Sequence, residues 1–378
     1  MRIALSALQQ RHFLTGTGRY TSELFRRLPL LAPGAEFILY VKPNQKHLFP
    51  HEPENSNLVI LKDCPSSPYG RVFWEYLRFP SVLAKGGVDL YHGPTNFLPP
   101  RKPCPFVVTL HDMFFFRNPD RTFLLRSLYW RHYIRTTWKL ADLILTVSEF
   151  SKREIMRYLP VPEEKIRVIY NGVNDRFFQN TPDILRREVR IEYGLDRPYI
   201  LFFGRLDPDK NPEGLIRAFA MLAQSGKAGD CILAIAGIED FHSERLPRIA
   251  KECLVDDRVR FLGYIKEEHL VPLYQEAKVL CYPSFNEGFG LPPLEAMAAG
   301  TPVVTSNISS LPEVVGDAGI QVDPSSPRDI ARGLEEALDP VRASELREAG
   351  RERAKTFTWD KTTQLTLQAY RDVLGNVM

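Results

Sequence analysis

The sequence is poor in features that define several protein classes. Its five cysteines are scattered over 378 residues and form no C-x-x-C pair, so neither a disulfide framework nor a thiolate metal site is indicated. No apolar run approaches the ~20 residues needed to cross a bilayer, and the first residues lack the apolar core of a signal peptide. The chain also has no G-x-x-x-x-G-K-[ST] loop for a nucleoside triphosphate and no G-x-S-x-G turn for acyl transfer. We therefore expect a protein of the reducing cytoplasm without a membrane-spanning segment.

Each half of the chain is short of charge of one sign. Residues 1–190 contain 28 Lys and Arg against 17 Asp and Glu, whereas residues 191–378 contain 21 against 29. The net charge of +3 therefore conceals +11 in the first half and −8 in the second. This asymmetry indicates two units with different partners, the first of which meets something anionic.

Short apolar runs alternate with amphipathic stretches along the whole chain, which predicts an α/β protein with two parallel sheets. A turn at Asn171-Gly172 and a polar helix over 183–193 indicate the joint. We expect one Rossmann-like domain over 1–175 and another over 190–358, with an amphipathic C-terminal helix (about 360–378) packing back on the first. The predicted strands are 2–8, 37–41, 58–61, 90–92, 106–110 and 143–147, and then 199–203, 232–236, 259–262, 279–282, 302–304 and 319–322.

The most informative stretch is YPSFNEGFGLPPLEAMAAGTPVVT, residues 282–305. Glu287 lies in a glycine-rich loop, and Pro292 and Pro293 mark the start of a helix that has Glu295 in its first turn. A helix N-terminus after glycines favours phosphate through its unpaired N–H groups and its dipole, whereas two carboxylates there favour the neutral hydroxyl groups of a sugar. The pair predicts a nucleotide-sugar ligand. The alternative is that Glu295 only complements the helix dipole and Glu287 is solvated.

A second loop favours the same ligand. The segment FFGRLDPDKN places Arg205 and Lys210 after a predicted strand, at the carboxyl end where open α/β sheets bind ligands. Two cations there can hold a diphosphate and offset its negative charge as it departs. The loop also contains Asp207-Pro208-Asp209, a D-x-D spacing that can hold a divalent metal. Because the cations already serve the phosphate, we expect no metal.

Two features of the first half also follow predicted strands. Gly16-Thr17-Gly18 precedes a helix and would let backbone N–H groups approach a phosphate; the alternative is that it only makes a tight turn. Thr21 occupies the third glycine position of a dinucleotide fingerprint, so a nicotinamide enzyme has only partial support. His111 closes the strand 106–110, where its side chain would reach the ligand-binding edge, or it would be structural.

Residues 113–139 combine six Lys and Arg with eight aromatic residues and one acid. The basic positions recur every four or five residues, as on one face of a helix. This composition suits anionic lipid headgroups or a polyanionic acceptor, and lipid binding would make the protein peripheral on the inner membrane face. An exposed basic face over a buried aromatic one is the alternative.

Together these residues resemble those of the retaining glycosyltransferases of the GT-B fold, family 4. The likeness rests on Glu287 and Glu295 within EGFGLPPLEAMAAGTPVV, on Arg205 and Lys210 after FFGR, on the NGV joint and on the glycine loop before GRY. It spans essentially the whole chain and implies two facing Rossmann-like domains. The nucleotide sugar would be held mainly by the C-terminal domain, and a saccharide or lipid-linked acceptor mainly by the N-terminal one. No metal, no cofactor beyond the nucleotide-sugar co-substrate and no nucleic acid are expected.

The resemblance also implies a role for each candidate residue. Glu287 would contact hydroxyl groups of the donor sugar near the reacting carbon, Glu295 would bind the ribose, and His111 would lie beside the donor sugar. The leaving diphosphate oxygen would itself accept the acceptor's proton on the same face, with Arg205 and Lys210 stabilising its charge. The remaining implied donor contacts are Phe289, Gly290 and Leu291 at the diphosphate, Gly16, Thr17 and Gly18 at the distal phosphate, and Tyr264 and Ile265 at the base.

The donor is suggested by a narrower likeness. The segments HGPTNFLPP and VVTLHDMFFFRNP look most like bacterial mannosyltransferases of surface polysaccharide assembly, which implies GDP-mannose. Relatives that use UDP-glucose or UDP-galactose share every phosphate-binding residue named above, so a UDP-sugar is one alternative. A GT-B scaffold that binds an anionic polymer without catalysis is the other.

Overall fold

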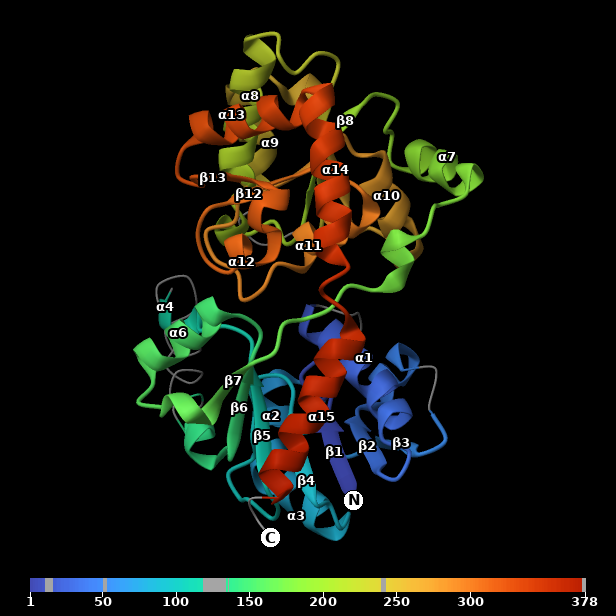
Figure 1. Ribbon diagram of the computed structural model, residues 1–378, viewed down its shortest axis with the longest axis vertical. Helices are drawn as coiled ribbons and strands as arrows, with labels where there is room; N and C mark the ends of the chain where they lie inside the picture. Colours follow the sequence, from blue (N-terminus) through green and yellow to red (C-terminus); the bar gives the residue numbers. More distant parts are fainter. Residues whose placement is uncertain (11–15, 50–52, 118–133, 135, 239–242, 376–378) are drawn as a thin grey trace. The chain divides into compact units, whose positions relative to one another are not determined.

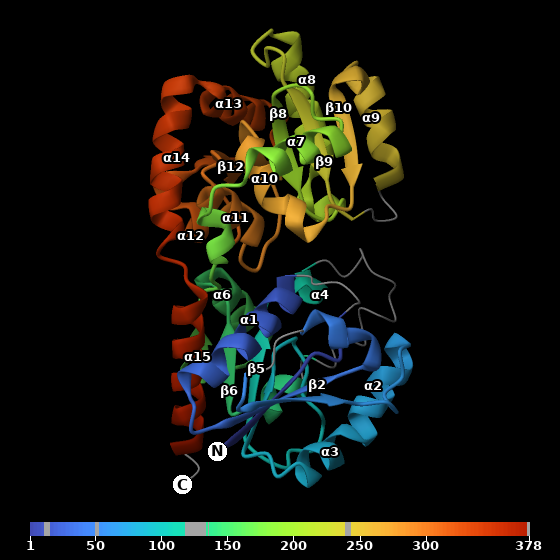
Figure 2. The same ribbon diagram turned by 90° about the vertical axis from the view of Figure 1, so that its right-hand side faces the viewer.

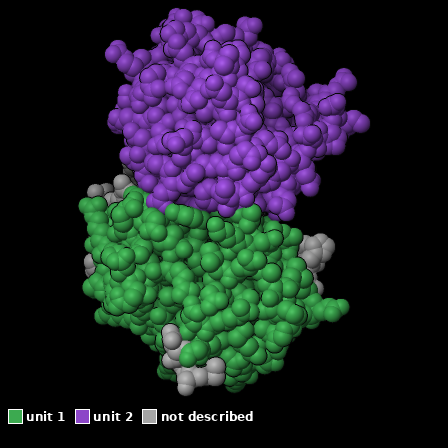
Figure 3. Space-filling model, viewed as in Figure 1, with its two compact units in different colours: residues 1–172, 358–378 green, residues 173–357 purple. Residues whose placement is uncertain are grey.

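The computed structural model describes residues 1–10, 16–49, 53–117, 134, 136–238 and 243–375. The chain divides into two compact units, which we call unit 1 (residues 1–172 and 358–378) and unit 2 (residues 173–357) (Figure 3). Unit 2 begins earlier than the expected residue 190 because helix α7 (Asp183–Glu192) belongs to it. Arg186 on α7 pairs with Glu276 on α10 (Leu270–Glu276) at 3.1 Å, which holds α7 against unit 2.

Unit 1 contains a seven-stranded parallel sheet with the order β3-β2-β1-β4-β5-β6-β7 (Figure 1). Six strands lie where the apolar runs predicted them. The short strand β7 was not predicted, because Arg167 interrupts its apolar run. The strands are β1 (Arg2–Ser6), β2 (Glu36–Val41), β3 (Ser56–Ile60), β4 (Leu90–Gly93), β5 (Phe106–Leu110), β6 (Leu143–Thr146) and β7 (Ile166–Val168).

The helices of unit 1 include the C-terminal helix, which returns to this unit as predicted. Helix α15 packs beside α1, as Figures 1 and 2 show. Ser67 caps α2 by accepting a hydrogen bond from the Gly70 N–H at 3.2 Å, which is the usual role of serine before a helix. The helices are α1 (Gly16–Leu31), η1 (Pro43–Leu48), α2 (Pro68–Leu77), α3 (Phe79–Lys85), α4 (Phe114–Arg117), α6 (Glu149–Tyr158) and α15 (Trp359–Gly375).

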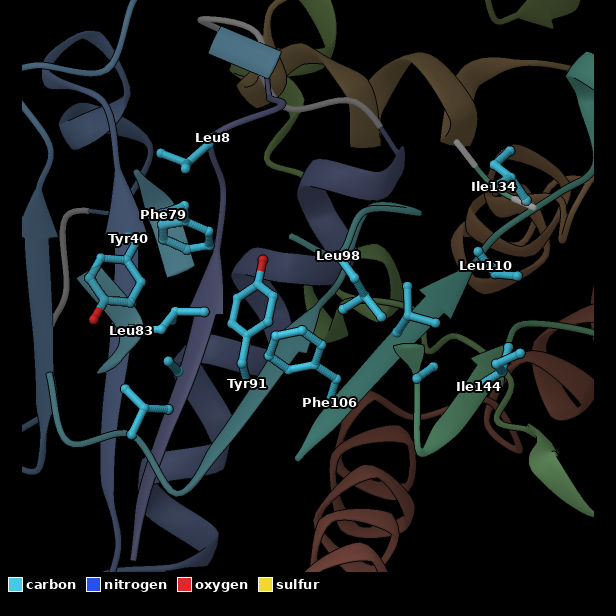
Figure 4. Packing of buried hydrophobic residues seen from close by; sticks show 14 of the residues in the cluster. Leu8, Tyr40, Phe79, Leu83, Tyr91, Leu98, Phe106, Leu110, Ile134 and Ile144 are labelled. Carbon is cyan, nitrogen blue, oxygen red and sulfur yellow. The ribbon is translucent and has the colours of Figure 1, made fainter. Parts of the chain in front are cut away.

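The two faces of this sheet are covered by different helices. Alternate residues of a strand point to opposite faces, and β4 shows the consequence. Tyr91 packs with Phe79 and Leu83 of α3 in a buried apolar cluster (Figure 4). The next residue, His92, contacts α15 on the opposite face. At β4 the sheet is therefore covered on both faces, by α3 on one and by α15 on the other.

Unit 2 contains a six-stranded parallel sheet with the order β10-β9-β8-β11-β12-β13. All six strands lie where the apolar runs predicted them, within two residues at either end. They are β8 (Tyr199–Phe203), β9 (Ile232–Ala236), β10 (Val259–Gly263), β11 (Val279–Tyr282), β12 (Val303–Ser306) and β13 (Ile320–Val322). Its other helices are α8 (Pro212–Gln224), α9 (Leu246–Glu252), α11 (Leu291–Ala299), α12 (Leu311–Val315), α13 (Pro327–Leu338) and α14 (Pro340–Ala354).

No helix in the part of the chain that the structure describes is both long and apolar enough to cross a membrane.

Candidate functional site

The candidate donor site of unit 2 lies at the point where the strand order of its sheet reverses. Strands β8 and β11 are neighbours, although β9 and β10 come between them in the sequence. Open α/β sheets bind ligands at the carboxyl ends of the strands at such a switch point. The two loops that leave these strands are residues 204–211 and 283–290, and they carry the predicted residues Arg205, Lys210 and Glu287.

Hydrogen bonds fasten these two loops to each other. The carbonyl oxygen of Asp209 accepts from the Phe285 N–H at 2.7 Å and from the Ser284 hydroxyl at 2.9 Å. Ser310, which is fully buried before α12, donates its hydroxyl to the Phe289 carbonyl at 2.8 Å and so holds the second loop from outside. Because the bonds of Asp209 join the loops, the side chains that they carry keep a fixed spacing. Neither serine was predicted, since a lone serine in a loop gives no signal in the sequence.

Lys210 and Glu287 form the centre of this site. Their ammonium and carboxylate groups make an ion pair, and Lys210 Nζ also donates to the Asn286 carbonyl at 3.2 Å. The Tyr282 hydroxyl donates to Glu287 Oε1 at 2.5 Å. Burial, and then the carboxylate of Glu287, raise the pKa of Tyr282 well above its usual value, so the phenol keeps its proton and remains a donor. The sequence therefore paired Lys210 and Glu287 in one site but missed Tyr282.

Arg205 extends the positive charge of the site toward solvent. Its side chain is 60% exposed, and Nη2 lies 2.6 Å from Asp207 Oδ2. Asp207 Oδ1 accepts from the backbone N–H groups of Asp209 and Lys210 at 3.0 and 3.1 Å, which caps the short helix η5 (Pro208–Lys210). The first carboxylate of the D-x-D spacing thus orders the loop. Among the described residues, no group of three or more His, Cys, Asp or Glu side chains is placed to hold a metal ion.

Glu295 occupies a different position from the one predicted. Helix α11 begins at Leu291 rather than at a proline, so Glu295 is its fifth residue and lies beyond the first turn. Gly290 precedes the helix with a φ of 108°, a left-handed conformation that favours glycine, and a Cβ at that position would lie 2.7 Å from Leu311 Cδ2. Glu295 is only 4% exposed, and its Oε2 accepts from the Tyr274 hydroxyl at 3.2 Å.

The other predicted donor contacts differ in how accessible their side chains are. The Phe289 ring is buried edge-on against Phe357, with 6.0 Å between ring centroids, so only its backbone can serve a ligand. Leu291 opens α11 and is partly buried. Tyr264 is 60% exposed and Ile265 is buried. Both follow β10, which is separated from β8 by β9.

In unit 1, the predicted glycine loop is part of a helix. Gly16, Thr17 and Gly18 form the first turn of α1 instead of preceding it. The Thr21 hydroxyl donates to the Thr17 carbonyl at 3.0 Å, a bond between successive turns that this helical conformation permits. The first N–H groups of a helix have no acceptor within it, so a contact between this turn and the distal phosphate stays a prediction.

His111 lies at the carboxyl end of β5 and is buried. Its Nε2 lies 2.8 Å from the Pro94 carbonyl oxygen, and its backbone N–H donates to Asn96 Oδ1 at 2.9 Å. Burial lowers the pKa of His111, so the ring is neutral near pH 7. Because a carbonyl can only accept, the proton of the neutral ring is on Nε2.

A buried hydrogen-bonded chain of side chains adjoins His111. The Tyr20 ring meets His111 edge-on with 5.0 Å between centroids, and its hydroxyl lies 3.0 Å from Thr109 Oγ1. Thr109 Oγ1 lies 2.7 Å from His92 Nε2, and His92 Nδ1 lies 2.6 Å from the Tyr370 hydroxyl of α15. These hydrogen bonds could not be predicted from the sequence, because the residues that form them are spread over α1, β4, β5 and α15.

Most of the basic aromatic segment over 113–139 lies outside the described residues, including Arg121, Arg126, Arg131 and Arg135. Of the other basic positions, Lys139 places its Nζ 5.9 Å from the centroid of the Trp138 ring. The expectation of membrane or polyanion contact therefore stays a prediction.

Comparison with known proteins agrees with the fold and the loops described above. The sequence model described as "Glycosyl transferases group 1" matches residues 186–357, and "Glycosyltransferase Family 4" matches residues 14–177. The chain is 31% identical to O-antigen chain mannosyltransferase B of Escherichia coli, with 98% of this chain and all of that protein covered. It is 30% identical to the serotype-specific mannosyltransferase WbdA of Escherichia coli over 72% of this chain, but spans only 34% of that protein.

Solved structures share the architecture of both units. Sucrose-phosphate synthase from Thermosynechococcus elongatus superimposes with a TM-score of 0.80 at 23% identity, covering 99% of each chain. Anabaena HepE, solved with UDP and glucose, gives a TM-score of 0.76 at 18% identity and covers 98% of this chain and 100% of that one. These two likenesses show the GT-B fold. Because a relative with 31% identity matches nearly the whole chain and the two family descriptions agree with it, the chain belongs to the GT-B glycosyltransferases of group 1 and family 4.

Proposed function

We propose that this glycosyltransferase moves mannose from GDP-mannose to a saccharide or lipid-linked acceptor, with retention of configuration and without a metal ion. The observation that carries the proposal is the cluster of Lys210, Glu287 and Tyr282 between the carboxyl ends of β8 and β11. Mannose is favoured because the relative matched from end to end is named an O-antigen chain mannosyltransferase.

The proposed reaction uses the two cations of unit 2 to stabilise the leaving group. Lys210 Nζ and the exposed Arg205 guanidinium would bind the diphosphate, and the backbone at Phe289, Gly290 and Leu291 would add N–H donors at the start of α11. The bond between the sugar carbon and the diphosphate oxygen breaks while the acceptor oxygen bonds to the same face. The acceptor's proton passes to the departing oxygen, whose growing charge the cations offset.

Glu287 would orient the sugar instead of attacking it. The contacts from Lys210 and Tyr282 both engage Oε1, and we assign Oε2 to the sugar hydroxyl groups. Two donors on one oxygen hold the carboxylate in a single orientation, which is what positioning of a substrate requires. Glu295 would serve the ribose, Tyr264 and Ile265 the base, Gly16 to Gly18 the distal phosphate, and His111 the donor sugar.

Slow hydrolysis of the donor tests this proposal without knowledge of the acceptor. We expect the wild-type protein to hydrolyse GDP-mannose and to release the α anomer first, as followed by proton NMR. Lys210→Ala should lower the rate by about 10²- to 10³-fold, as loss of one transition-state donor does in other enzymes. Lys227→Ala is the matched control, because Lys227 is an exposed lysine of unit 2 that pairs with Glu335.

The donor is tested with a thermal-shift panel of GDP, UDP, ADP and their sugars. A shift with GDP-mannose and a smaller or absent one with UDP-glucose and UDP-galactose would support mannose. A preference for a UDP-sugar would replace the donor and leave glycosyl transfer intact. Binding of none of them, with no hydrolysis, would favour a scaffold without catalysis.

We also propose that the protein works in the cytoplasm as a peripheral protein of the inner membrane face, through residues 113–139. The support is the density of cations and aromatic residues in this segment. Wild-type protein should bind anionic vesicles less as salt increases, and replacing Arg126, Arg131 and Arg135 with glutamine should abolish binding. Unchanged binding by the triple variant would remove the membrane role from this segment.

A further inference from the structure

Four buried polar side chains lie at the carboxyl ends of β1 and β2 in unit 1, and none of them is assigned to the donor. Gln10 follows β1, Lys42 follows β2, and Arg71 and Glu75 are one turn apart on α2. Each is at most 9% exposed, and Glu75 is completely buried. Arg71 Nη1 reaches the Leu8 carbonyl after β1 at 3.5 Å, which ties α2 to this edge. We call these four residues the α2 polar cluster.

The support for two members of the α2 polar cluster is a single buried glutamine, Gln45. Its Nε2 donates to the carbonyl oxygens of Ala7 and Gln10 at 2.8 and 2.7 Å, and its Oε1 accepts from the Lys42 N–H at 2.8 Å. The backbones that carry Gln10 and Lys42 are therefore fixed by one side chain. A fixed first shell of polar groups is what a binding site needs.

Several buried polar atoms of the α2 polar cluster have no hydrogen-bond partner among the described residues. Five of the cluster's side-chain atoms are in this state: Gln10 Nε2 and Oε1, Arg71 Nε, and both oxygens of Glu75. Arg71 Nε lies 3.4 Å from Glu75 Oε2, close enough for charge attraction but without the alignment of a hydrogen bond. Buried side-chain polar atoms are nearly always hydrogen-bonded in folded proteins, so these atoms call for polar partners.

The mixture of donors and acceptors indicates which group that is. Gln10 and Arg71 offer N–H donors and Lys42 an ammonium, whereas Gln10 Oε1 and the ionised form of Glu75 accept. A phosphate would be repelled by Glu75, and a metal cation would be repelled by Lys42 and Arg71. A hydroxyl group both donates and accepts, so neighbouring hydroxyl groups of a sugar ring satisfy both kinds. Burial raises the pKa of Glu75 to about 7 despite Arg71 and Lys42, so near neutral pH the group is present both as a carboxylate that accepts and as an acid that also donates.

We propose that the α2 polar cluster binds hydroxyl groups of the acceptor saccharide. The inference rests on the proposed function, because it takes the acceptor to be a saccharide. The cluster lies at the carboxyl edge of the sheet, and its member Gln10 follows β1, the strand that borders the strand-order reversal between β1 and β4. The α2 polar cluster would thus provide unit 1 with side chains that bind the acceptor through its hydroxyl groups.

Calorimetry with two ligands separates this inference from the proposed function. The full chain is titrated with an α-linked mannotriose and, separately, with GDP-mannose. Glu75→Gln keeps the shape of the side chain but replaces one acceptor oxygen by a donor, so we expect mannotriose to bind at least 10-fold more weakly and GDP-mannose to bind within 2-fold of wild type. Glu36→Gln is the matched control, because Glu36 is a partly exposed carboxylate of unit 1 that pairs with Arg2 at 2.8 Å; its binding of both ligands should equal wild type.

The outcomes are distinct. Equal mannotriose affinity in wild type and Glu75→Gln overturns the inference, and so does a wild-type protein that binds neither mannotriose nor the matching glucose and galactose trisaccharides. Displacement of mannotriose by inorganic phosphate would make the cluster an anion site and would also overturn it. If Glu75→Gln does not fold, as judged by circular dichroism, Gln10→Ala decides by the same criterion. If the wild-type protein does not bind GDP-mannose, the proposed function is contradicted, whether or not the protein binds mannotriose.

Discussion

The contact between Tyr370 and His92 allows a sharp test of how the C-terminal helix is held. His92 is completely buried, with its two nitrogens 2.6 Å from the Tyr370 hydroxyl and 2.7 Å from Thr109 Oγ1. Burial lowers the pKa of His92 to about 3, so the ring is neutral at pH 7, with one nitrogen donating and the other accepting. Tyr370→Phe keeps the ring that packs against His92 but removes the hydroxyl partner of Nδ1.

The size of the effect follows from leaving one buried ring nitrogen without a partner. Such a loss costs about 1–3 kcal/mol, so we expect the free energy of unfolding of unit 1 to fall by that amount at pH 7. All four tryptophans of the chain, at positions 74, 130, 138 and 359, fall within the residue ranges of unit 1. Tryptophan fluorescence in urea therefore reports the unfolding of unit 1 separately from that of unit 2.

Tyr76→Phe is the control for this experiment. Tyr76 is also in unit 1 and is 51% exposed, so loss of its hydroxyl should change the free energy by less than about 0.5 kcal/mol. An equal urea midpoint for Tyr370→Phe and wild type, with unchanged slope, would refute the view that this hydrogen bond fastens α15 to the sheet.

Three further predictions concern pH and backbone space. In the unfolded chain His92 takes up a proton near pH 6.5, whereas the folded ring resists protonation down to about pH 3. The free energy of unfolding of unit 1 should therefore fall by up to about 1.4 kcal/mol per pH unit below 6.5, relative to His92→Gln. Parallel pH profiles of the two unfolding free energies would contradict this. The folded pKa of Glu75 is about 7 instead of 4.5. As the pH rises from 4.5 to 7, the free energy of unfolding of wild type should therefore fall by up to about 3 kcal/mol relative to Glu75→Gln. A constant difference between the two proteins across that range would contradict this. Gly237→Ala would place a Cβ 1.6 Å from the Gly204 carbonyl oxygen and should lower the melting temperature of unit 2 by circular dichroism far more than Gly226→Ala, where the space is open; equal melting temperatures would show that the loop yields.

Much of the fold could be predicted because strands of an enclosed parallel sheet are continuous apolar runs. The runs Phe106–Leu110 and Ile232–Ala236 match β5 and β9 residue for residue. Strand β7 was not predicted, because a three-residue edge strand with Arg167 at its centre has no continuous apolar run. Helices α1 and α11 were predicted in the right order, but their first residues, Gly16 and Leu291, were not. A 3.6-residue period locates a helix better than it locates its first residue.

The start of α11 illustrates why the site was only partly predictable. The sequence paired the loops of Arg205, Lys210 and Glu287, because carboxyl ends of neighbouring parallel strands meet at one edge of a sheet. The position of Glu295 depends on where α11 begins, and the residue before it, Gly290, has a left-handed conformation in a place where a Cβ would meet Leu311, 21 residues away in the sequence. No local pattern contains that information.

The chain of hydrogen bonds beside His111 shows the same limit over a longer distance. His92 and Tyr370 are 278 positions apart, and each has an ordinary local sequence. Only the return of α15 to unit 1 brings them together. The division of charge between the two halves was likewise a poor guide to the anionic substrate, since in our proposal the acidic half holds the diphosphate through local cations.

Calorimetric titration of GDP-mannose into wild type and Lys210→Ala tests the central claim most directly. We predict saturable binding by wild type, a loss of at least 10-fold in affinity for Lys210→Ala, and wild-type affinity for the control Lys227→Ala. Equal affinity of Lys210→Ala and wild type would contradict the claim that the loops after β8 and β11 hold the donor diphosphate.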